Sequence, residues 1–252
     1  YPDRAIRRRL AERTPMTETF ITPIPQAEAS HVAPLRRMRR IAFAVAATAA
    51  SLTGALALAP ATATAAQGGL PTNAMAPVVT TSAQAALESY DEWAATQSPA
   101  AYRSYVWYRT QTAQFAATEL GYPQQDMVTA WASTPVEHQR AVLAAMTQVG
   151  VPYRTNTSQE GVGFDCSGLT TFAWSRAGVQ LIRQSTSQIR AAAPLDRSTA
   201  KAGDLVQSPG HVMMFLGVGD AIIHSVQSGR TVELDTINGR RVNSVRFGDP
   251  TI

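Results

Sequence analysis

Phe164-Asp165-Cys166-Ser167-Gly168-Leu169 is the stretch that decides how this sequence is interpreted, and it contains the single cysteine of the 252-residue chain. Apolar residues recur at positions 169, 172 and 173, and Gly178 follows the pattern. A carboxylate just before such a pattern is a typical helix N-cap. We therefore predict a helix capped by Asp165 that runs through Ala177, with Cys166 in its first turn.

A cysteine at a helix N-terminus has the surroundings of a nucleophile. The unpaired backbone N–H groups and the helix dipole favour the thiolate, and the same N–H groups can donate to an oxyanion. A lone cysteine cannot form an internal disulfide, and a free thiol in an exported protein is a liability unless it is buried or used. The alternative to a nucleophile is a buried structural cysteine.

A thiolate nucleophile needs a base, and the chain has four histidines. His31 lies in the N-terminal leader, and His138 lies beside charged residues early in a predicted helix, where we expect it on the surface. His211 and His224 lie on two successive predicted strands. A hairpin centred between residues 218 and 219 puts 211 opposite 226 and 213 opposite 224, so the two imidazoles share one face as diagonal neighbours. With Cys166 they form a set of nucleophile, base and orienting group.

The same three side chains could also hold a catalytic zinc ion. The chain lacks a close-spaced ligand pair such as C-x-x-C or H-E-x-x-H. We therefore favour thiol catalysis, and we expect neither a metal nor an organic cofactor.

The rest of the chain predicts an α+β fold with an antiparallel sheet. Helices are expected at 82–95, capped by Ser82, at 99–120, capped by Ser98 and ended by Gly121, and at 134–150, opened by a capping box at Thr134. Tyr105, Tyr108, Thr112 and Phe115 form one packing face of the second helix. Strand signals follow at 205–207, 212–216, 221–226, 231–237 and 241–247, and Asn238-Gly239 predicts a hairpin between the last two. Helices followed by a meander of strands are typical of α+β domains.

The sequence pattern of residues 36–63 predicts an export signal. Arg36-Arg37-Met38-Arg39-Arg40 precedes an apolar run from residue 41 to residue 59, which Ala61-Thr62-Ala63 follows. This layout predicts a signal peptide over residues 38–66, with the exported chain beginning near residue 64. The alternative is a membrane anchor, because the run is about long enough to span a bilayer. Polar residues dilute the run, and we favour cleavage, with no membrane attachment afterwards.

The charge of the chain is concentrated in its leader. Of 22 basic and 18 acidic residues, nine arginines and four acids lie in residues 1–40, which leaves 13 basic and 14 acidic residues and a net charge of −1. A body without a cationic stripe does not favour nucleic-acid binding. We interpret 1–37 as a disordered or untranslated leader, 67–81 as a linker, 82–133 as a helical region without an assigned role and 134–252 as the main domain.

Residues from about 137 to 237 resemble the NlpC-type domain, the papain-like cysteine peptidases that remodel bacterial cell walls. The resemblance rests on the order and spacing of several motifs: Gly150-Val151-Pro152-Tyr153, the stretch around Cys166, Ala177-Gly178-Val179, Arg183-Gln184-Ser185 with Gln188, Ala202-Gly203-Asp204-Leu205, Gly210-His211-Val212, Phe215-Leu216-Gly217 and Ile222-Ile223-His224. The family usually has proline where Ile182 stands and often where Ala202 stands. These departures leave the catalytic set untouched but put the shape of the cleft in doubt.

The resemblance implies Cys166 as nucleophile, His211 as base and His224 as the third, polar residue. It also implies supporting roles near the active centre for Tyr153, Asp165 and Ser167. If these side chains face the cleft, they could collect the ammonium of a free N-terminal L-alanine; the alternative is that Asp165 only caps the helix. The expected protein is a monomeric hydrolase, secreted and cell-wall associated. Its expected partners are peptidoglycan stem peptides, cut between γ-D-glutamate and diaminopimelate. The alternatives are an N-acetylmuramoyl-L-alanine amidase, an acyltransferase and a non-catalytic wall-binding module.

Overall fold

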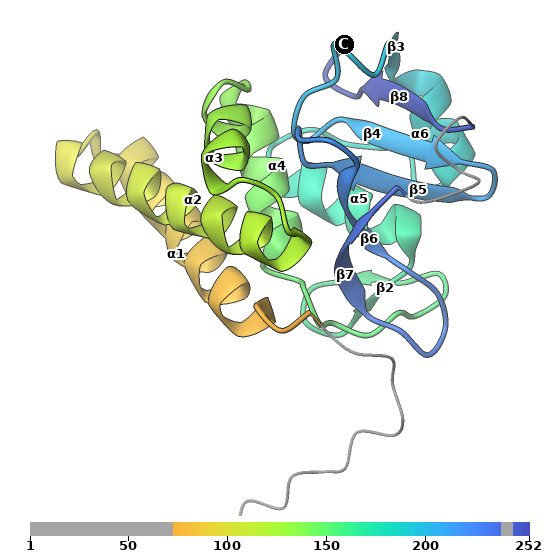
Figure 1. The fold of residues 1–252 in the computed structure, drawn as a ribbon, viewed down its shortest axis with the longest axis horizontal. Helices are drawn as coiled ribbons and strands as arrows, with labels where there is room; N and C mark the ends of the chain where they lie inside the picture. The colour runs from red at the N-terminus through yellow and green to blue at the C-terminus, as the bar shows by residue number, and fades with distance from the viewer. Residues whose placement is uncertain (1–72, 238–243) are drawn as a thin grey trace, which may run out of the picture. The chain divides into compact units, whose positions relative to one another are not determined.

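A helical region precedes the sheet in the computed structural model, which describes residues 73–237 and 244–252. It consists of α1 (Ala76–Thr96), α2 (Pro99–Leu120) and α3 (Gln124–Ala132). Figure 1 shows α1 and α2 running side by side. The leader, the predicted signal peptide, residues 67–72 and the Asn238-Gly239 turn lie outside the described residues. None of the described helices is long and apolar enough to cross a membrane.

The predicted bounds of α2 are confirmed. The Ser98 hydroxyl accepts a hydrogen bond from the Ala101 N–H, and Gly121 ends the helix in a left-handed conformation with φ of 72°. Tyr105 and Thr112 are buried, and Tyr108 and Phe115 pack against the main core, so the predicted packing face is correct.

The predicted start of α1 was wrong. The helix begins six residues before Ser82, and residues 76–81, which their composition assigned to a linker, form its first turns. Ser82 lies inside the helix and donates to the Val78 carbonyl and the Val79 carbonyl. Its oxygen also accepts a hydrogen bond from Thr112 on α2. Ser82 therefore joins two helices instead of opening one.

The helix α4 (Val136–Met146) forms without the predicted capping box. Pro135 occupies the N-cap position, and the Thr134 hydroxyl donates backwards to the Trp131 carbonyl. The helix ends at Met146, four residues earlier than the predicted stop at Gly150. Residues 141–146 are all fully buried, so α4 is enclosed by other elements.

Two short strands, two helices and the large sheet follow α4. A two-stranded sheet of β1 (Ser158–Gln159) and β2 (Gly163–Phe164) leads into α5 (Cys166–Arg176), which α6 (Ser185–Ala191) follows. The large antiparallel sheet has the order β3-β8-β4-β5-β6-β7. Its strands are β3 (Ala193–Leu195), β4 (Leu205–Ser208), β5 (His211–Phe215), β6 (Ala221–Ser225), β7 (Val232–Thr236) and β8 (Arg246–Asp249). The helices and the antiparallel sheet confirm the α+β fold class.

The meander prediction holds for β4 to β7 and fails for the last strand. β8 pairs with β3 and β4 at the other side of the sheet, not with β7. The outer edge of β7 is already occupied. The Asn73 side chain binds both the N–H and the carbonyl of Leu234. At the start of the same strand, the Val232 carbonyl accepts from the Gly150 N–H, and the Val232 N–H donates to the Val151 carbonyl. A returning strand therefore has no free edge there.

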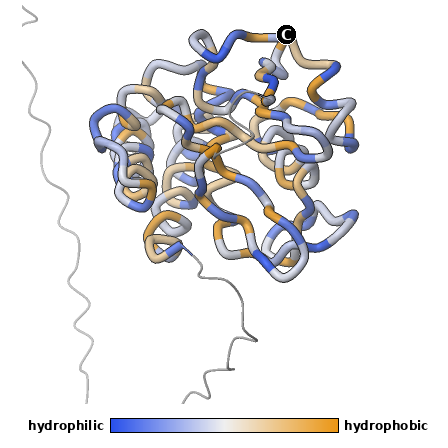
Figure 2. Tube along the Cα trace, turned by 45° about the vertical axis from the view of Figure 1, so that its right-hand side comes forward, coloured by the Kyte–Doolittle hydropathy of each residue, from blue (hydrophilic) through white to orange (hydrophobic). Residues whose placement is uncertain are grey.

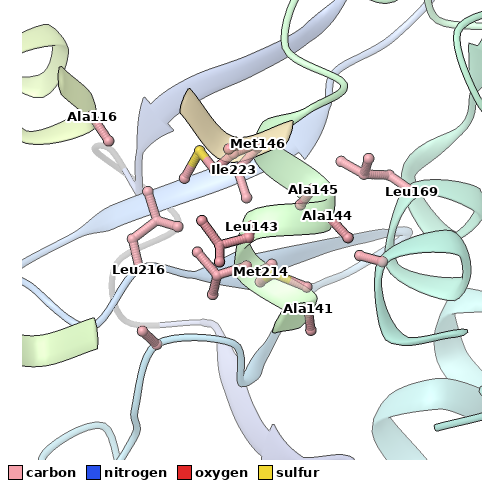
Figure 3. Close-up of a cluster of buried hydrophobic side chains, with 14 of the residues drawn as sticks. Ala116, Ala141, Leu143, Ala144, Ala145, Met146, Leu169, Met214, Leu216 and Ile223 are labelled. Atoms are coloured by element: carbon pink, nitrogen blue, oxygen red, sulfur yellow. The ribbon is translucent and has the colours of Figure 1, made fainter. Parts of the chain in front are cut away.

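The main core lies between the helices and one face of the large sheet. Figure 3 shows Leu143 and Met146 of α4 among Met214, Leu216 and Ile223 of the sheet region. A smaller cluster, which includes Met213 and Ile222, covers the opposite face. Figure 2 shows hydrophobic and hydrophilic residues interspersed along the chain.

Candidate active site

The N-terminus of α5 carries Cys166 as its first residue. The Asp165 side chain accepts a hydrogen bond of 2.7 Å from the Gly168 N–H, and this confirms the predicted cap. The Asp165 N–H donates to the Thr157 carbonyl, which fastens the helix start to the loop before β1. A Cβ added at Gly168 would lie 2.1 Å from that same carbonyl oxygen, so the approach requires glycine. Cys166 is partly exposed at the tip of this fixed helix start.

The strands β5 and β6 carry the two predicted histidines in the predicted register. Met214 lies opposite Ile223 and Phe215 opposite Ile222, which makes His211 and His224 diagonal neighbours. Their rings lie 5.1 Å apart, and His211 Nε2 is 2.8 Å from His224 Nδ1. His224 is buried, and His211 is partly exposed at the start of β5.

A hydrogen bond joins β6, which carries His224, to the segment that leads into α5. The Ser225 hydroxyl, next to His224 in the chain, donates to the Phe164 carbonyl at 2.7 Å. Phe164 stands two residues before Cys166, and Ser225 is fully buried. This contact holds β6 against the segment that leads into α5.

Tyr153 reaches the same place from the loop that covers the edge of β7. Its N–H donates to the Arg230 carbonyl, and a β-bridge pairs it with Phe164. Partial burial raises the pKa of the Tyr153 hydroxyl, and the neighbouring charges of Cys166 and Asp165 raise it further. The phenol is therefore within electrostatic reach of both groups and stays protonated as a hydrogen-bond donor at neutral pH.

Asp165 and Ser167 both bind Arg183. This residue belongs to the Arg183-Gln184-Ser185 motif, but its role was not predicted from the sequence. Arg183 donates to Asp165 Oδ2 at 2.6 Å and to the Ser167 hydroxyl at 2.8 Å. Burial alone would raise the pKa of Asp165. The hydrogen bonds from Arg183 and the Gly168 N–H outweigh burial and hold that pKa below its usual value. The carboxylate is therefore ionised, paired and engaged as a cap.

A second residue missed by the sequence reasoning lies on β7. Asp235 Oδ2 is 3.5 Å from His224 Nε2, on the side of the ring that faces away from His211. The interaction with His224 lowers the pKa of Asp235 more than burial raises it. The register could have revealed this residue, because Ile222 lies opposite Asp235 and shares a sheet face with His224.

His138 is not on the surface, contrary to expectation. It is 1% exposed, and its Nε2 lies 3.1 Å from Asp204 Oδ1 and 3.5 Å from Asp249 Oδ1. Within the described ranges, these three residues form the group whose ligand atoms could hold a metal ion. Each carboxylate already accepts a hydrogen bond from a backbone N–H, of Lys201 and Thr251 respectively. We interpret the cluster as a buried polar link between α4 and the ends of two strands.

A model described as the NlpC/P60 family matches residues 150–248. The chain contains an NlpC/P60 domain. The match includes Tyr153, Cys166, His211, His224 and Asp235 and excludes α1 to α4. The domain thus extends further towards the C-terminus than the resemblance at 137–237 suggested.

Two relatives that match part of this chain are named as peptidases. The murein DD-endopeptidase MepH of Escherichia coli K12 is 35% identical over 103 residues, which cover 37% of this chain and 38% of MepH. The gamma-D-glutamyl-L-lysine dipeptidyl-peptidase of Bacillus cereus is 35% identical over 98 residues, 36% of this chain and 29% of that protein. This chain therefore spans less than half of either relative. A solved NlpC/P60 family structure from Bacillus cereus has 27% identity, a TM-score of 0.41 and coverage of 44% of this chain and 39% of that one.

Proposed function

We propose that this chain is a secreted, cell-wall-associated cysteine peptidase that hydrolyses peptidoglycan stem peptides, with Cys166, His211 and His224 as its catalytic set. The observation that carries the proposal is the 2.8 Å contact between the imidazoles of His211 and His224. The strand that carries His224 is also hydrogen-bonded to the segment before Cys166. The peptidase names of the relatives support the reaction class. The wall-binding alternative needs the loss of the cysteine or the base, and both are retained.

The proton transfers in the mechanism follow from which ring nitrogen of His211 contacts His224. Because His211 Nε2 binds His224, Nδ1 of His211 is the atom that exchanges protons with Cys166 and the substrate. The Cys166 thiolate attacks the amide carbonyl carbon, and the Cys166 N–H with the Tyr153 hydroxyl stabilises the oxyanion. The imidazolium protonates the leaving amine as the C–N bond breaks. The neutral imidazole that remains then takes a proton from the water that attacks the thioester, and breaking of the C–S bond restores the Cys166 thiolate beside the imidazolium.

For the bond that is cut, we propose the one between the γ-carboxyl of D-glutamate and the diamino acid at the third stem position. The γ-glutamyl specificity named for the Bacillus cereus relative supports this bond. The equally similar MepH is named for a DD-bond, so cleavage of a D-alanyl cross-link is the second candidate. An amidase would instead cut between muramic acid and L-alanine.

Mass spectrometry of digests separates these bonds. Three substrates are needed: the L-Ala-γ-D-Glu-diaminopimelate peptide, a D-alanyl cross-linked dimer of it, and the same peptide attached to muramic acid. Release of L-Ala-γ-D-Glu is the expected result, and Cys166→Ala provides the inactive control. Cleavage confined to the cross-link or to the muramoyl bond would replace our assignment with the corresponding alternative. Equal turnover by Cys166→Ala would contradict thiol catalysis itself.

We further propose that Tyr153, Asp165 and Ser167 line the part of the cleft that receives the free N-terminal ammonium of the stem peptide. Tyr153 lies within electrostatic reach of Asp165 and Cys166, and Asp165 and Ser167 are the sequence neighbours of the nucleophile. Arg183 already neutralises the Asp165 carboxylate, so the ammonium must share this carboxylate with a guanidinium. The free peptide should still be cut faster than the N-acetylated one.

A further inference from the structure

A diagonal row of three polar side chains crosses neighbouring strands of the large sheet. His211 on β5, His224 on β6 and Asp235 on β7 occupy positions on the same sheet face, each shifted by two residues from the direct partner of the previous one. Figure 1 shows these three strands side by side. The row places a carboxylate behind the second imidazole, on the side away from the base.

The direction of each hydrogen bond along this row depends on the tautomer of His224. When His211 is protonated by Cys166, its Nε2 carries a hydrogen, so His224 Nδ1 must accept. A neutral His224 then carries its own proton on Nε2. That nitrogen is buried and makes no close hydrogen bond within the described part of the chain. The charged acceptor that it faces is Asp235 Oδ2 at 3.5 Å.

We propose that Asp235 is a positioning residue that holds His224 in the Nε2-protonated tautomer, so that His224 can accept the hydrogen bond of the protonated His211. The inference deepens the proposed thiol mechanism and rests on it. The carboxylate is 36% exposed, and its Oδ2 at 3.5 Å lies just beyond ordinary hydrogen-bond distance from His224 Nε2. Its depressed pKa keeps it ionised through the range in which a histidine titrates.

The other charges near His224 do not replace this role. Glu233 lies directly opposite His224 on β7, but its carboxylate oxygens bind Arg230 and Thr231. Arg230 and Asp235 interact electrostatically, so the guanidinium also contributes to the low pKa of Asp235. Cys166 is the titrating partner of His211 in the proposed mechanism. Asp235 is therefore the carboxylate available to the buried nitrogen.

The test compares Asp235→Ala and Asp235→Glu with Asp196→Ala as the control. Asp196 is an exposed aspartate near the end of β3, so its loss removes the same charge away from the histidines. The first readout is the ring ¹⁵N NMR spectrum of His224, which distinguishes the tautomers. The second is the rate of Cys166 alkylation by iodoacetamide from pH 5 to pH 10. Neither readout needs a peptidoglycan substrate, so both decide the inference even if the proposed substrate is wrong.

Wild type should show His224 protonated at Nε2, and Asp235→Ala should lose that preference. The rate of Cys166 alkylation at neutral pH should fall. The kcat for peptide hydrolysis should drop about tenfold with little change in KM. This loss is smaller than the roughly 10⁴-fold loss seen when the removed carboxylate orients the base directly. The alkaline limb of the kcat profile should move to lower pH, because the imidazolium loses a negative neighbour. Asp235→Glu should recover part of each effect. A wild-type His224 protonated at Nδ1, or an Asp235→Ala protein that behaves like Asp196→Ala, would overturn the proposal.

Discussion

Replacing Arg183 by methionine tests how the start of α5, which carries Cys166, is held in place. The guanidinium joins three acceptors: Asp165 Oδ2 at 2.6 Å, the Ser167 hydroxyl at 2.8 Å and the Thr157 carbonyl at 3.3 Å. These acceptors lie on both sides of Cys166 in the sequence and on the loop before β1. Methionine keeps the unbranched stem of the side chain and removes every donor.

The size of the effect follows from these contacts. A hydrogen bond to a charged group contributes about 1.5–3 kcal/mol to stability. The Arg183 side chain is 42% exposed, so solvent screening reduces that value, whereas Asp165 is only 10% exposed. We expect Arg183→Met to lower the free energy of unfolding by about 1–2 kcal/mol at pH 7.

The pH dependence has a definite sign. The folded-state pKa of Asp165 is depressed, so its contribution to stability is present above its unfolded pKa and is lost as the pH falls through the folded pKa. Without Arg183, fewer interactions offset the effect of burial, so the pKa of Asp165 is lowered less. The difference between wild type and variant should therefore be full at pH 7 and should shrink below about pH 4, as Asp165 becomes protonated.

Urea unfolding followed by circular dichroism at pH 7 and at pH 3 measures both quantities. Arg190→Met is the matched control, because Arg190 is an exposed arginine on α6. A loss below about 0.5 kcal/mol at pH 7, the range of ordinary surface changes, would refute the reasoning. A loss of full size that is the same at pH 3 and pH 7 would show that packing of the stem, and not the charge pair with Asp165, is responsible.

Three further predictions concern the proposed chemistry. His224→Ala should reduce kcat less than His211→Ala does. His224→Asn or His224→Gln should retain more activity than His224→Ala, because an amide oxygen can accept the hydrogen bond of the His211 N–H. Equal loss in all folded variants would contradict the orienting role. Iodoacetamide should inactivate the wild-type enzyme and EDTA should not, whereas loss with EDTA that zinc restores would favour the metal alternative. In Arg183→Met, the rate ratio of free to N-acetylated peptide should rise, because the ammonium no longer shares Asp165; an unchanged ratio of one in both proteins would remove Asp165, Ser167 and Tyr153 from substrate binding.

Local signals in the sequence were sufficient where a short-range interaction determines the structure. The cap at Asp165 involves residues three apart, and the β5–β6 register is centred on the turn at residues 217–220. For the same reason Ser98 and Gly121 define α2 within one residue. The diagonal placement of His211 and His224 therefore followed from parity and turn position alone.

Long-range contacts account for the errors. The return of β8 to β4 depends on Asn73 and the loop after α4 covering the edge of β7, and no local pattern encodes that cover. Likewise, His138 looked like a surface residue because its sequence neighbours are charged. Its actual partners, Asp204 and Asp249, are far away in the chain. Tertiary packing decides such positions, and it overrides local polarity.

The hydrophobic pattern of the β5–β6 hairpin also protects the geometry of the site. Met214 and Ile223 lie directly opposite each other and are fully buried on the helix side, while Met213 and Ile222 pack in the smaller cluster on the other face. Slipping one strand by a single residue would turn its whole set of side chains to the wrong face. His211 and His224 would then point to opposite faces, and their 2.8 Å contact could not form. The burial that stabilises the hairpin thus fixes the pairing of the two imidazoles, and the same constraint on β6 and β7 sets the distance from His224 to Asp235.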